Sequence, residues 1–384
     1  MKRIVLLVPL MFAACGVDLG GYGNGTGSKS GVKQAALNCP KTPAPQTFGQ
    51  AVCLCHDLQL VGQGFLAKQG AGGPAEVDIN GKMEVVGQHE VDGKLSVGQR
   101  IEGTGQLTVN GDAICQGDVE GVGQVKVTHD LSVGGNLESV GQLEVDGSLG
   151  VKGDTQQVGD QHVAALCSYA DPGAPPCDCA NSTLPDVASA IAAAKATNDN
   201  AASGVPTHID TVGQTDLHFP TGSFYLSGLS SVGQTKLFID GAVALYIDGD
   251  IETVGQENIQ LADGATLDLY VGGQLSSVGQ SLLSDPAHAG SVRLYLGATG
   301  SVDLQVGSSD MNGLVYAPHA TLNVVGDTTI RGAIFADGLS GVGRVTIEYA
   351  GVTLPGSNLC NPDGTAVPGS SGANPADVPN NGLN

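Results

Sequence analysis

Four glutamates and four glutamines recur every 18 residues in the first half of the chain, where they could bind a ligand repetitively. The set comprises Glu84, Glu102, Glu120 and Glu138 and, four residues after each, Gln88, Gln106, Gln124 and Gln142. If one coil of a stacked structure takes up this spacing, equivalent carboxylates lie ~4.8 Å apart. Carboxylates at that separation repel one another, and each raises the pKa of the next. Divalent cations relieve such repulsion, so Ca²⁺ is the ion that this face could bind.

The glutamines of this set can hydrogen-bond along their own column as a ladder of amides. Two interpretations of the face stay open. It can be a cation-assisted contact surface for a partner or a matrix. It can equally be a solvated face that was duplicated together with the repeat, and this second interpretation needs no ligand.

Nine cysteines form the second group of reactive side chains, and they indicate an oxidising compartment. Two clusters resemble each other: Cys39 followed by Cys53-Leu54-Cys55, and Cys167 followed by Cys177-Asp178-Cys179. Two cysteines separated by one residue rarely bond to each other, because their side chains are badly placed for it. We therefore expect partners that are distant in sequence. The disulfide candidates are Cys39, Cys53, Cys55, Cys167, Cys177, Cys179 and Cys360.

A metal site is the alternative for the first cluster, with Cys53, Cys55 and the adjacent His56 as ligands. Their spacing matches no standard zinc pattern, so we favour disulfides and expect no metal there. Cys115 occupies an inward-facing place of the repeat and is expected to be a buried free thiol. When Cys15 and Cys115 are set aside, an odd number of cysteines remains. They cannot all pair with one another, so the connectivity stays open.

Repeats of six residues position these side chains. Fourteen hexads follow one another without a gap over residues 77–160, with glycine in the fifth place of twelve and an apolar residue in the first place of twelve. Places one and three suit the buried side of a strand, and glycine allows a bend at a corner. Every third hexad ends in Val-Gly-Gln or a near copy. Three hexads therefore make one coil of a parallel β-helix, and we expect it to be right-handed.

These hexads, arranged in coils of 18 residues, resemble the bactofilins, the polymer-forming β-helical scaffolds of bacteria. The resemblance covers residues 77–160. It implies a structural rod that can stack end to end.

The Val-Gly-Gln ending returns at Val212, Val232, Val254 and Val278, with a looser spacing than before. Strand-like runs lie between these endings, and they predict a second β-helix over residues 205–354. Residues 164–204 separate the two arrays as a cysteine-rich linker. Within it, Pro185 to about Thr197 reads as a short helix, which we expect to cap an open strand edge. The predicted fold class is all-β, with two solenoids and a capping helix between them.

The second half also resembles a widespread exported bacterial domain of unknown function, found in cell-surface and pilus-assembly-associated proteins. The matching residues are Tyr316, Ala317, Pro318 and Ala320, followed by Gly326, Gly332 and Ala333. That family often closes with His-Tyr-Asp, where this chain has Glu348-Tyr349-Ala350. The resemblance covers residues 186–354. It implies a fold and a surface location, and it supplies no catalytic residues.

The N-terminus indicates export. Lys2 and Arg3 precede an apolar run from Ile4 to Ala13, which is too short to span a bilayer. Residues 12–16 (FAACG) resemble a bacterial lipobox, so we expect lipidation of Cys15, with ordinary secretion as the alternative. By resemblance to sorting rules, Gly16 favours the outer membrane or cell surface. The predicted organisation is 1–15 signal peptide, 16–38 tether, 39–163 cysteine-containing cap and first β-helix, 164–204 linker, 205–354 second β-helix, and 355–384 disordered tail.

Composition narrows the function. A formal net charge of −22 makes nucleic acid a poor partner. The eight histidines form no metal or triad pattern, and no nucleophile or phosphate-binding motif is present. We expect a non-catalytic envelope lipoprotein that acts as a structural or adhesive rod, anchored to the membrane by its lipid and able to associate with itself or with a surface polymer. The alternative is a β-helical carbohydrate-active enzyme or glycan-binding protein, which the absence of tryptophan disfavours.

Overall fold

The computed structural model describes residues 47–68, 75–121, 123–138, 140–169, 171–180, 184–279, 286–306, 310–352 and 365. They belong to one compact unit that spans residues 36–384. The predicted signal peptide and tether lie outside the described residues, as does the predicted tail apart from Thr365. Within the described part of the chain, no helix is long and apolar enough to cross a membrane.

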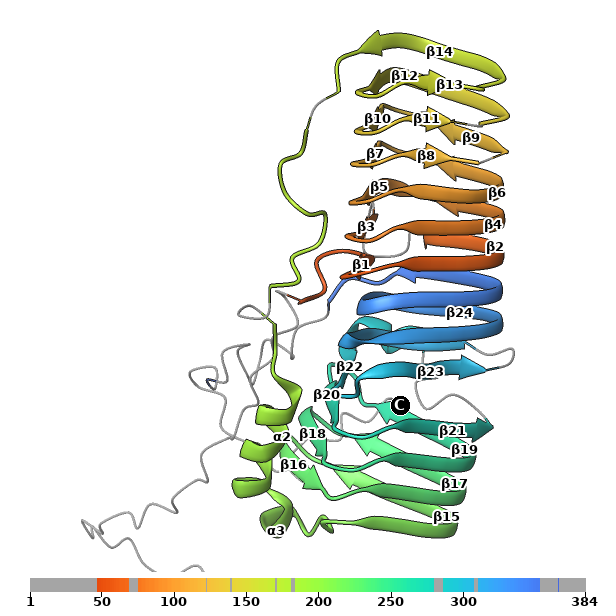
Figure 1. Ribbon diagram of the computed structural model, residues 1–384. Coiled ribbons are helices and arrows are strands. Elements are labelled where there is room, and N and C mark those ends of the chain that lie inside the picture. The colour runs from red at the N-terminus through yellow and green to blue at the C-terminus, as the bar shows by residue number, and fades with distance from the viewer. Residues whose placement is uncertain are drawn as a thin grey trace, which may run out of the picture. The chain divides into compact units, whose positions relative to one another are not determined.

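The described residues form a parallel β-solenoid of about 11 turns (Figure 1). The first array contains β1 (Val52–Leu54), β2 (Leu58–Lys68), β3 (Ala75–Ile79), β4 (Met83–Val91), β5 (Gly93–Val97), β6 (Ile101–Val109), β7 (Ala113–Cys115), β8 (Val119–Glu120), β9 (Gln124–Val127), β10 (Leu131–Val133), β11 (Leu137–Glu138), β12 (Gln142–Val151), β13 (Thr155–Gln156) and β14 (Asp160–Cys167).

The helices and the second array follow in the sequence. They are α2 (Val187–Ala196), α3 (Asn200–Ser203), β15 (Ile209–Phe219), β16 (Gly222–Leu226), β17 (Leu229–Ile239), β18 (Ala242–Ile247), β19 (Ile251–Leu261), β20 (Thr266–Val271), β21 (Leu275–Gly279), η1 (Pro286–Ser291), β22 (Val292–Leu296), β23 (Gly300–Val306) and β24 (Asp310–Tyr349).

Each coil of the first array follows the predicted hexads. Residues 18 apart in the sequence pair in parallel, as Met83 does with Ile101 and Leu131 with Leu149. The first and third places of a hexad point into the core, so Met83, Leu95 and Val97 are fully buried. A long strand such as β4 forms two walls of a coil by bending at a glycine, and a short strand such as β5 forms the third wall. The prediction of β-helical coils of 18 residues is confirmed.

The expectation of two separate solenoids is wrong, because the two arrays form one. Strand β1 pairs in parallel with β24, with Val52 beside Ile334, and β2 pairs with β24, with Leu58 beside Leu339. The last coil of the second array therefore continues directly into the first coil of the first array. A strand edge is unfavourable when its backbone N–H and C=O groups have no hydrogen-bond partner. This junction, which we call the seam, pairs two such edges with each other. The predicted handedness stays a prediction.

The order of the coils along the solenoid differs from their order in the sequence (Figure 1). The chain enters at β1 in the middle and winds to β14 at one end. The return segment, whose described residues are 168–169, 171–180 and 184, then leads back past the first array towards α2. From β15 at the other end, the chain winds towards the middle and closes against β1 and β2.

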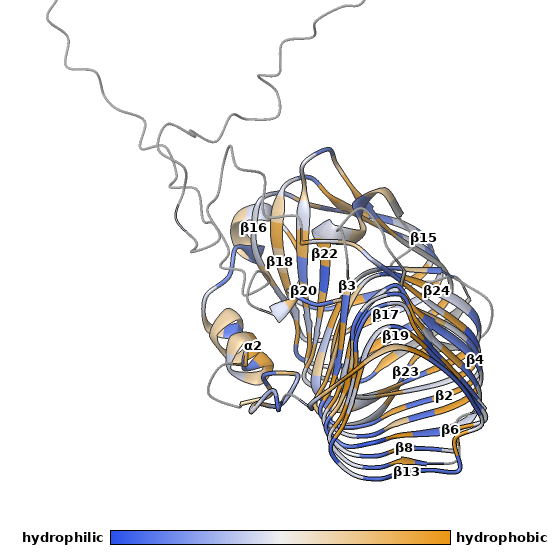
Figure 2. Ribbon diagram, turned by 90° about the horizontal axis from the view of Figure 1, so that it is seen from above, coloured by the Kyte–Doolittle hydropathy of each residue, from blue (hydrophilic) through white to orange (hydrophobic). Residues whose placement is uncertain are grey.

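The predicted helix is present as α2, with Asp186 as its N-cap, accepting a hydrogen bond from the Ser189 amide. It lies outside the wall formed by β16, β18 and β20, rather than across an end (Figures 1 and 2). Its buried side chains are those of Val187, Ile191 and Ala194. Ile191 lies against Gly272, where the missing side chain lets the helix approach the wall.

Tyrosines occupy equivalent positions on this wall of successive coils. The column comprises Tyr225, Tyr246, Tyr270, Tyr295 and Tyr316. The rings of Tyr246 and Tyr270 stack with their centroids 4.6 Å apart, and those of Tyr270 and Tyr295 are 4.5 Å apart. The column joins the helix to the wall, because Tyr316 donates a hydrogen bond to the Pro185 carbonyl over 3.1 Å. Offset stacking of this kind adds to the stabilisation from burial alone.

A buried ion pair lies on the same wall. Arg293 donates a hydrogen bond to Asp268 on the neighbouring coil, and both side chains are almost completely buried. Asp268 raises the pKa of Arg293, although burial itself acts in the opposite direction. Removing either partner would leave a buried charge, so each of the two side chains requires the other.

Glycine at the bend of each coil sets the distance between successive coils. Gly62, Gly87 and Gly343 have φ angles of +122°, +115° and +114°, which L side chains rarely adopt. A Cβ at Gly87 would lie 1.9 Å from the carbonyl oxygen of Gly62, and one at Gly62 would lie 2.1 Å from that of Gly343. This glycine column crosses the seam and comprises Gly326, Gly343, Gly62, Gly87, Gly105, Gly123, Gly141 and Gly159.

We expect Gly87→Ala to destabilise the solenoid more than Gly213→Ala. Gly213 also has a positive φ, +102°, but lies in a terminal coil where an added Cβ meets nothing within 4 Å. Gly213→Ala thus reports only the backbone strain, about 1–3 kcal/mol. Gly87→Ala adds a collision with the backbone of the neighbouring coil. Urea unfolding followed by circular dichroism measures both, and equal costs would contradict this account of the column.

Candidate functional site

The structure places the four predicted glutamates in one column on one wall. Glu84 pairs with Glu102, Glu102 with Glu120, and Glu120 with Glu138. Basic side chains of the same wall neutralise part of this charge. Lys82 forms ion pairs with both Glu84 and Glu102, and Arg100 lies 2.9 Å from Glu102.

The expected mutual rise of the glutamate pKa values is wrong for Glu84. Hydrogen bonds from Lys82 and with Glu102 lower the pKa of Glu84, and the charges of Lys82 and Arg100 act in the same direction. The hexad pattern did not indicate this lowering of the pKa, because Lys82 and Arg100 end the preceding hexads and reach the column only after the chain turns the corner. The described residues contain no group of three acidic, histidine or cysteine side chains that could hold a metal ion. Binding of Ca²⁺ to the column stays a prediction.

The predicted amide ladder is present beside the glutamates. Gln88 donates to Gln106 over 3.0 Å, Gln106 donates to Gln124, and Gln124 donates to Gln142. The column of residues continues to the seam, where Gln63 is paired with Gln88 in the strand register and accepts hydrogen bonds from Arg344 of β24. Each glutamine immediately follows a glycine of the column, and this bend aligns the amides along one corner.

Two shallow cavities adjoin the ladder. One has a volume of about 180 Å³ and lies beside Phe65, Gln88 and His89. The other, of about 110 Å³, lies beside Gln124 and Lys126. His89 fills the space left by the missing side chain of Gly64, and it is 3% exposed. Burial lowers the pKa of His89, so this imidazole is a neutral core residue at physiological pH.

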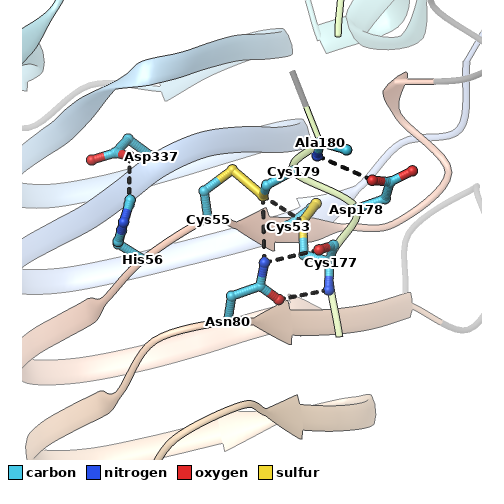
Figure 3. Close-up of a disulfide and its surroundings, with 9 residues drawn as sticks. All are labelled: Cys53, Cys55, His56, Asn80, Cys177, Asp178, Cys179, Ala180 and Asp337. Atoms are coloured by element: carbon cyan, nitrogen blue, oxygen red, sulfur yellow. Dashed lines mark hydrogen bonds and ion pairs between the residues drawn. A yellow bond between two sulfur atoms is a disulfide. The ribbon is translucent and has the colours of Figure 1, made fainter. Parts of the chain in front are cut away.

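The two similar cysteine clusters bond to each other. Disulfides join Cys53 to Cys177 and Cys55 to Cys179, each across 124 residues, and they fasten the return segment to β1 at the seam (Figure 3). Asn80 supports the same contact, since its side chain both donates to the Cys177 carbonyl and accepts from the Cys177 amide, each over 2.8 Å. The adjacent His56, the third ligand of the metal alternative, lies 2.6 Å from Asp337.

The remaining cysteines have different fates. Cys115 is a buried free thiol, as predicted, and burial raises its pKa to about 12. Cys167, a disulfide candidate, is free and exposed in the last strand of the first array. The lipidation candidate Cys15 and the disulfide candidates Cys39 and Cys360 lie outside the described residues.

The return segment covers the wall formed by the short strands of the first array. Gln116 donates to the Ala174 carbonyl over 2.8 Å, and Lys152 lies over the ring of Tyr169. Asp78 is consequently buried on the outer side of this wall, next to Cys53 in the strand register, and it accepts a hydrogen bond from Gln50. Burial raises the pKa of Asp78 to about 6.

A protein-family profile described as a domain of unknown function (DUF7305) matches residues 177–352. The expectation of a domain of unknown function in the second half is confirmed. The match begins at the cysteine that bonds to Cys53, so the matched region is covalently attached to the first array. No curated protein and no solved structure matches the chain. The resemblance of the first array to bactofilins stays a prediction.

The two disulfides should contribute to stability in a non-additive way. Both close nearly the same loop, so either one alone constrains the unfolded chain almost fully. We expect Cys53→Ala/Cys177→Ala and Cys55→Ala/Cys179→Ala each to retain most of this contribution. The fourfold variant should lose ~5 kcal/mol, the chain-entropy value for a loop of this length. Guanidinium chloride unfolding of the three variants tests this, and a fourfold loss equal to the sum of the two pair losses would contradict it.

Asp78 should make stability depend on pH. Its folded-state pKa of about 6 lies above the ordinary pKa of an aspartate, 3.8. The folded state therefore binds the proton of Asp78 more tightly than the unfolded state does. The resulting contribution to the free energy of unfolding is complete below pH ~4 and is lost as the pH rises through ~6. Asp78→Asn should remove up to about 3 kcal/mol of this pH dependence. Thermal melting between pH 4 and 7 measures it, with the exposed Asp263→Asn as the control; parallel profiles for Asp78→Asn and the parent would refute the assignment.

Proposed function

We propose that this chain is a non-catalytic, exported lipoprotein that serves as a rigid structural or adhesive rod, anchored through Cys15 at the outer membrane or cell surface. The observation that carries the proposal is the seam. Two arrays that are separate in sequence are paired strand to strand into one solenoid, and disulfides fix the return segment across the junction. At ~4.8 Å per coil, about 11 turns span ~50 Å.

The walls support a structural role better than a catalytic one. The two cavities beside the amide ladder, of about 180 and 110 Å³, are smaller than a usual small-molecule pocket, which measures ~300–1,000 Å³. On the neighbouring wall, Glu84 and Glu102 are paired with Lys82 and Arg100, and the glutamates form a column along one wall rather than an acid and a base across a cleft.

The finer architecture belongs to the same proposal. We take the winding to be right-handed, as parallel crossovers generally are. We assign the cap of one solenoid end to the residues after α2, not to α2 itself. Asn200 donates to the Tyr225 carbonyl and accepts from the Tyr225 amide, and Asp199 accepts from the Ser223 amide. These bonds satisfy the outer edge of β16, which otherwise would be open.

Glycan binding is the second candidate, favoured by the cavity beside Phe65. An exposed aromatic ring and a column of amides together suit a hydroxyl-rich ligand, because each unused amide N–H and lone pair can meet a hydroxyl. A glycan-binding protein would leave the polysaccharide intact, whereas a carbohydrate-active enzyme would convert it.

Incubation of the mature chain with a panel of bacterial and plant polysaccharides tests the proposal. We expect no increase in reducing ends, and we expect sedimentation velocity with and without Ca²⁺ to reveal assemblies larger than a monomer. Release of reducing ends that is lost on unfolding would overturn the non-catalytic assignment. Metabolic labelling with palmitate tests the anchor, since the label should enter the parent chain and be absent from Cys15→Ala.

A further inference from the structure

Most of the large apolar side chains that the described residues expose lie on one corner of the solenoid. Nine are exposed, and seven of these are valines that precede a corner glycine. The seven are Val212, Val232, Val254, Val325, Val342, Val61 and Val86, with 43% to 83% of each residue exposed. We call this column the valine stripe. Single exposed apolar residues are ordinary, but their concentration along one line is not.

The stripe continues across the seam. Val342 of β24 pairs with Val61 of β2, and Val61 pairs with Val86 of β4. In the second array, Val212 pairs with Val232, and Val232 with Val254. The stripe therefore lies on both sides of the seam, with a spacing of ~4.8 Å between neighbouring coils. It ends at Val86, because Thr104 takes the equivalent place in the next coil and Val140 is buried.

The stripe is free of net charge where it crosses the seam. Its neighbours on one side are Gln59 and Ser340, and on the other side Phe65 and Thr346. The two charged side chains there, Asp327 and Arg344, lie 3.4 Å apart and offset each other. The chain as a whole carries a formal charge of −22, so the uncharged surroundings of Val342 and Val61 at the seam reduce the repulsion between two copies that meet there.

The amide ladder meets the stripe in the coil of Val86 and Gln88, and it can bond to a second ladder. A primary amide has two N–H groups and two acceptor lone pairs. The ladder bonds of Gln106, which accepts from Gln88 and donates to Gln124, use one of each. A partner can engage every coil at once only if it carries the same parallel repeat. A second copy of this chain has that repeat together with complementary valines and amides.

We infer that the valine stripe is a side-by-side contact between two copies of this chain. The inference deepens the proposed function and rests on its self-association. From Val212 to Val86 the stripe spans ~40 Å, and with a width of ~10 Å it offers ~400 Å² per copy, about half of what a standard interface buries. The contact is therefore weak in solution, and anchoring many copies to one membrane raises their effective concentration to strengthen it.

Sedimentation velocity of the mature chain from micromolar to about 1 mM tests this contact, since 1 mM is the effective concentration that tethering provides. The parent should dimerise with increasing concentration, and Val61→Glu/Val86→Glu should weaken dimerisation at least tenfold. Gln99→Glu/His129→Glu makes the same charge change at exposed positions away from the stripe and should dimerise like the parent. Val61→Thr/Val86→Thr keeps the β-branched shape and should weaken dimerisation less. Unchanged thermal melting checks that each variant is folded.

The outcomes separate this inference from the proposed function. Leu166 is 82% exposed in the last strand of the first array, and Leu166→Glu places a charge at that solenoid end. If Leu166→Glu abolishes assembly and the stripe variants assemble like the parent, the stripe contact is overturned and rod self-association stands. If the parent stays monomeric up to about 1 mM, both the proposed self-association and the stripe contact are contradicted.

Discussion

The close approach of backbones at one corner is the constraint on which the rest of this structure depends. Within the glycine column, from Gly343 to Gly159, each glycine lies against the carbonyl of the glycine in the neighbouring coil, at a distance that leaves no room for a Cβ. This contact fixes which residue of one coil lies above which residue of the next. Once that register is set, every other column follows: valines before the glycine, amides after it, glutamates on the adjoining wall and apolar side chains in the core.

The order of the chain along the solenoid explains the cysteines. Because the chain begins in the middle, it must return past the first array before it can build the second, and the seam joins β1 and β2 to residues nearly 300 positions later. Such pairing carries a large loss of conformational entropy, since distant segments must meet. The disulfides Cys53–Cys177 and Cys55–Cys179 hold the return segment at the seam and reduce that loss.

Stacking identical residues also creates a problem of charge, and the solenoid solves it locally. Lys82 and Arg100 approach the glutamate column from the preceding corner, which lowers the pKa of Glu84 instead of raising it. On the wall beneath α2, Arg293 pairs with a buried Asp268 of the next coil. The corner at the seam carries no net charge, and it is there that an acidic chain presents apolar side chains. The pattern of charge thus distinguishes the walls, whose backbones are alike.

The sequence by itself determined the coil. Hexads with glycine in the fifth place predicted the 18-residue register, the glutamate and glutamine columns and the buried thiol of Cys115, because each depends only on the period of neighbouring residues. The helix near Pro185 was predicted from its local composition, with proline in the first turn and alanines after it. Only the tertiary structure decided that the arrays join, which cysteines pair, and where α2 lies. No local period records how distant segments meet, so the pairing of Leu58 with Leu339 and of Cys53 with Cys177 had no signal in the repeat.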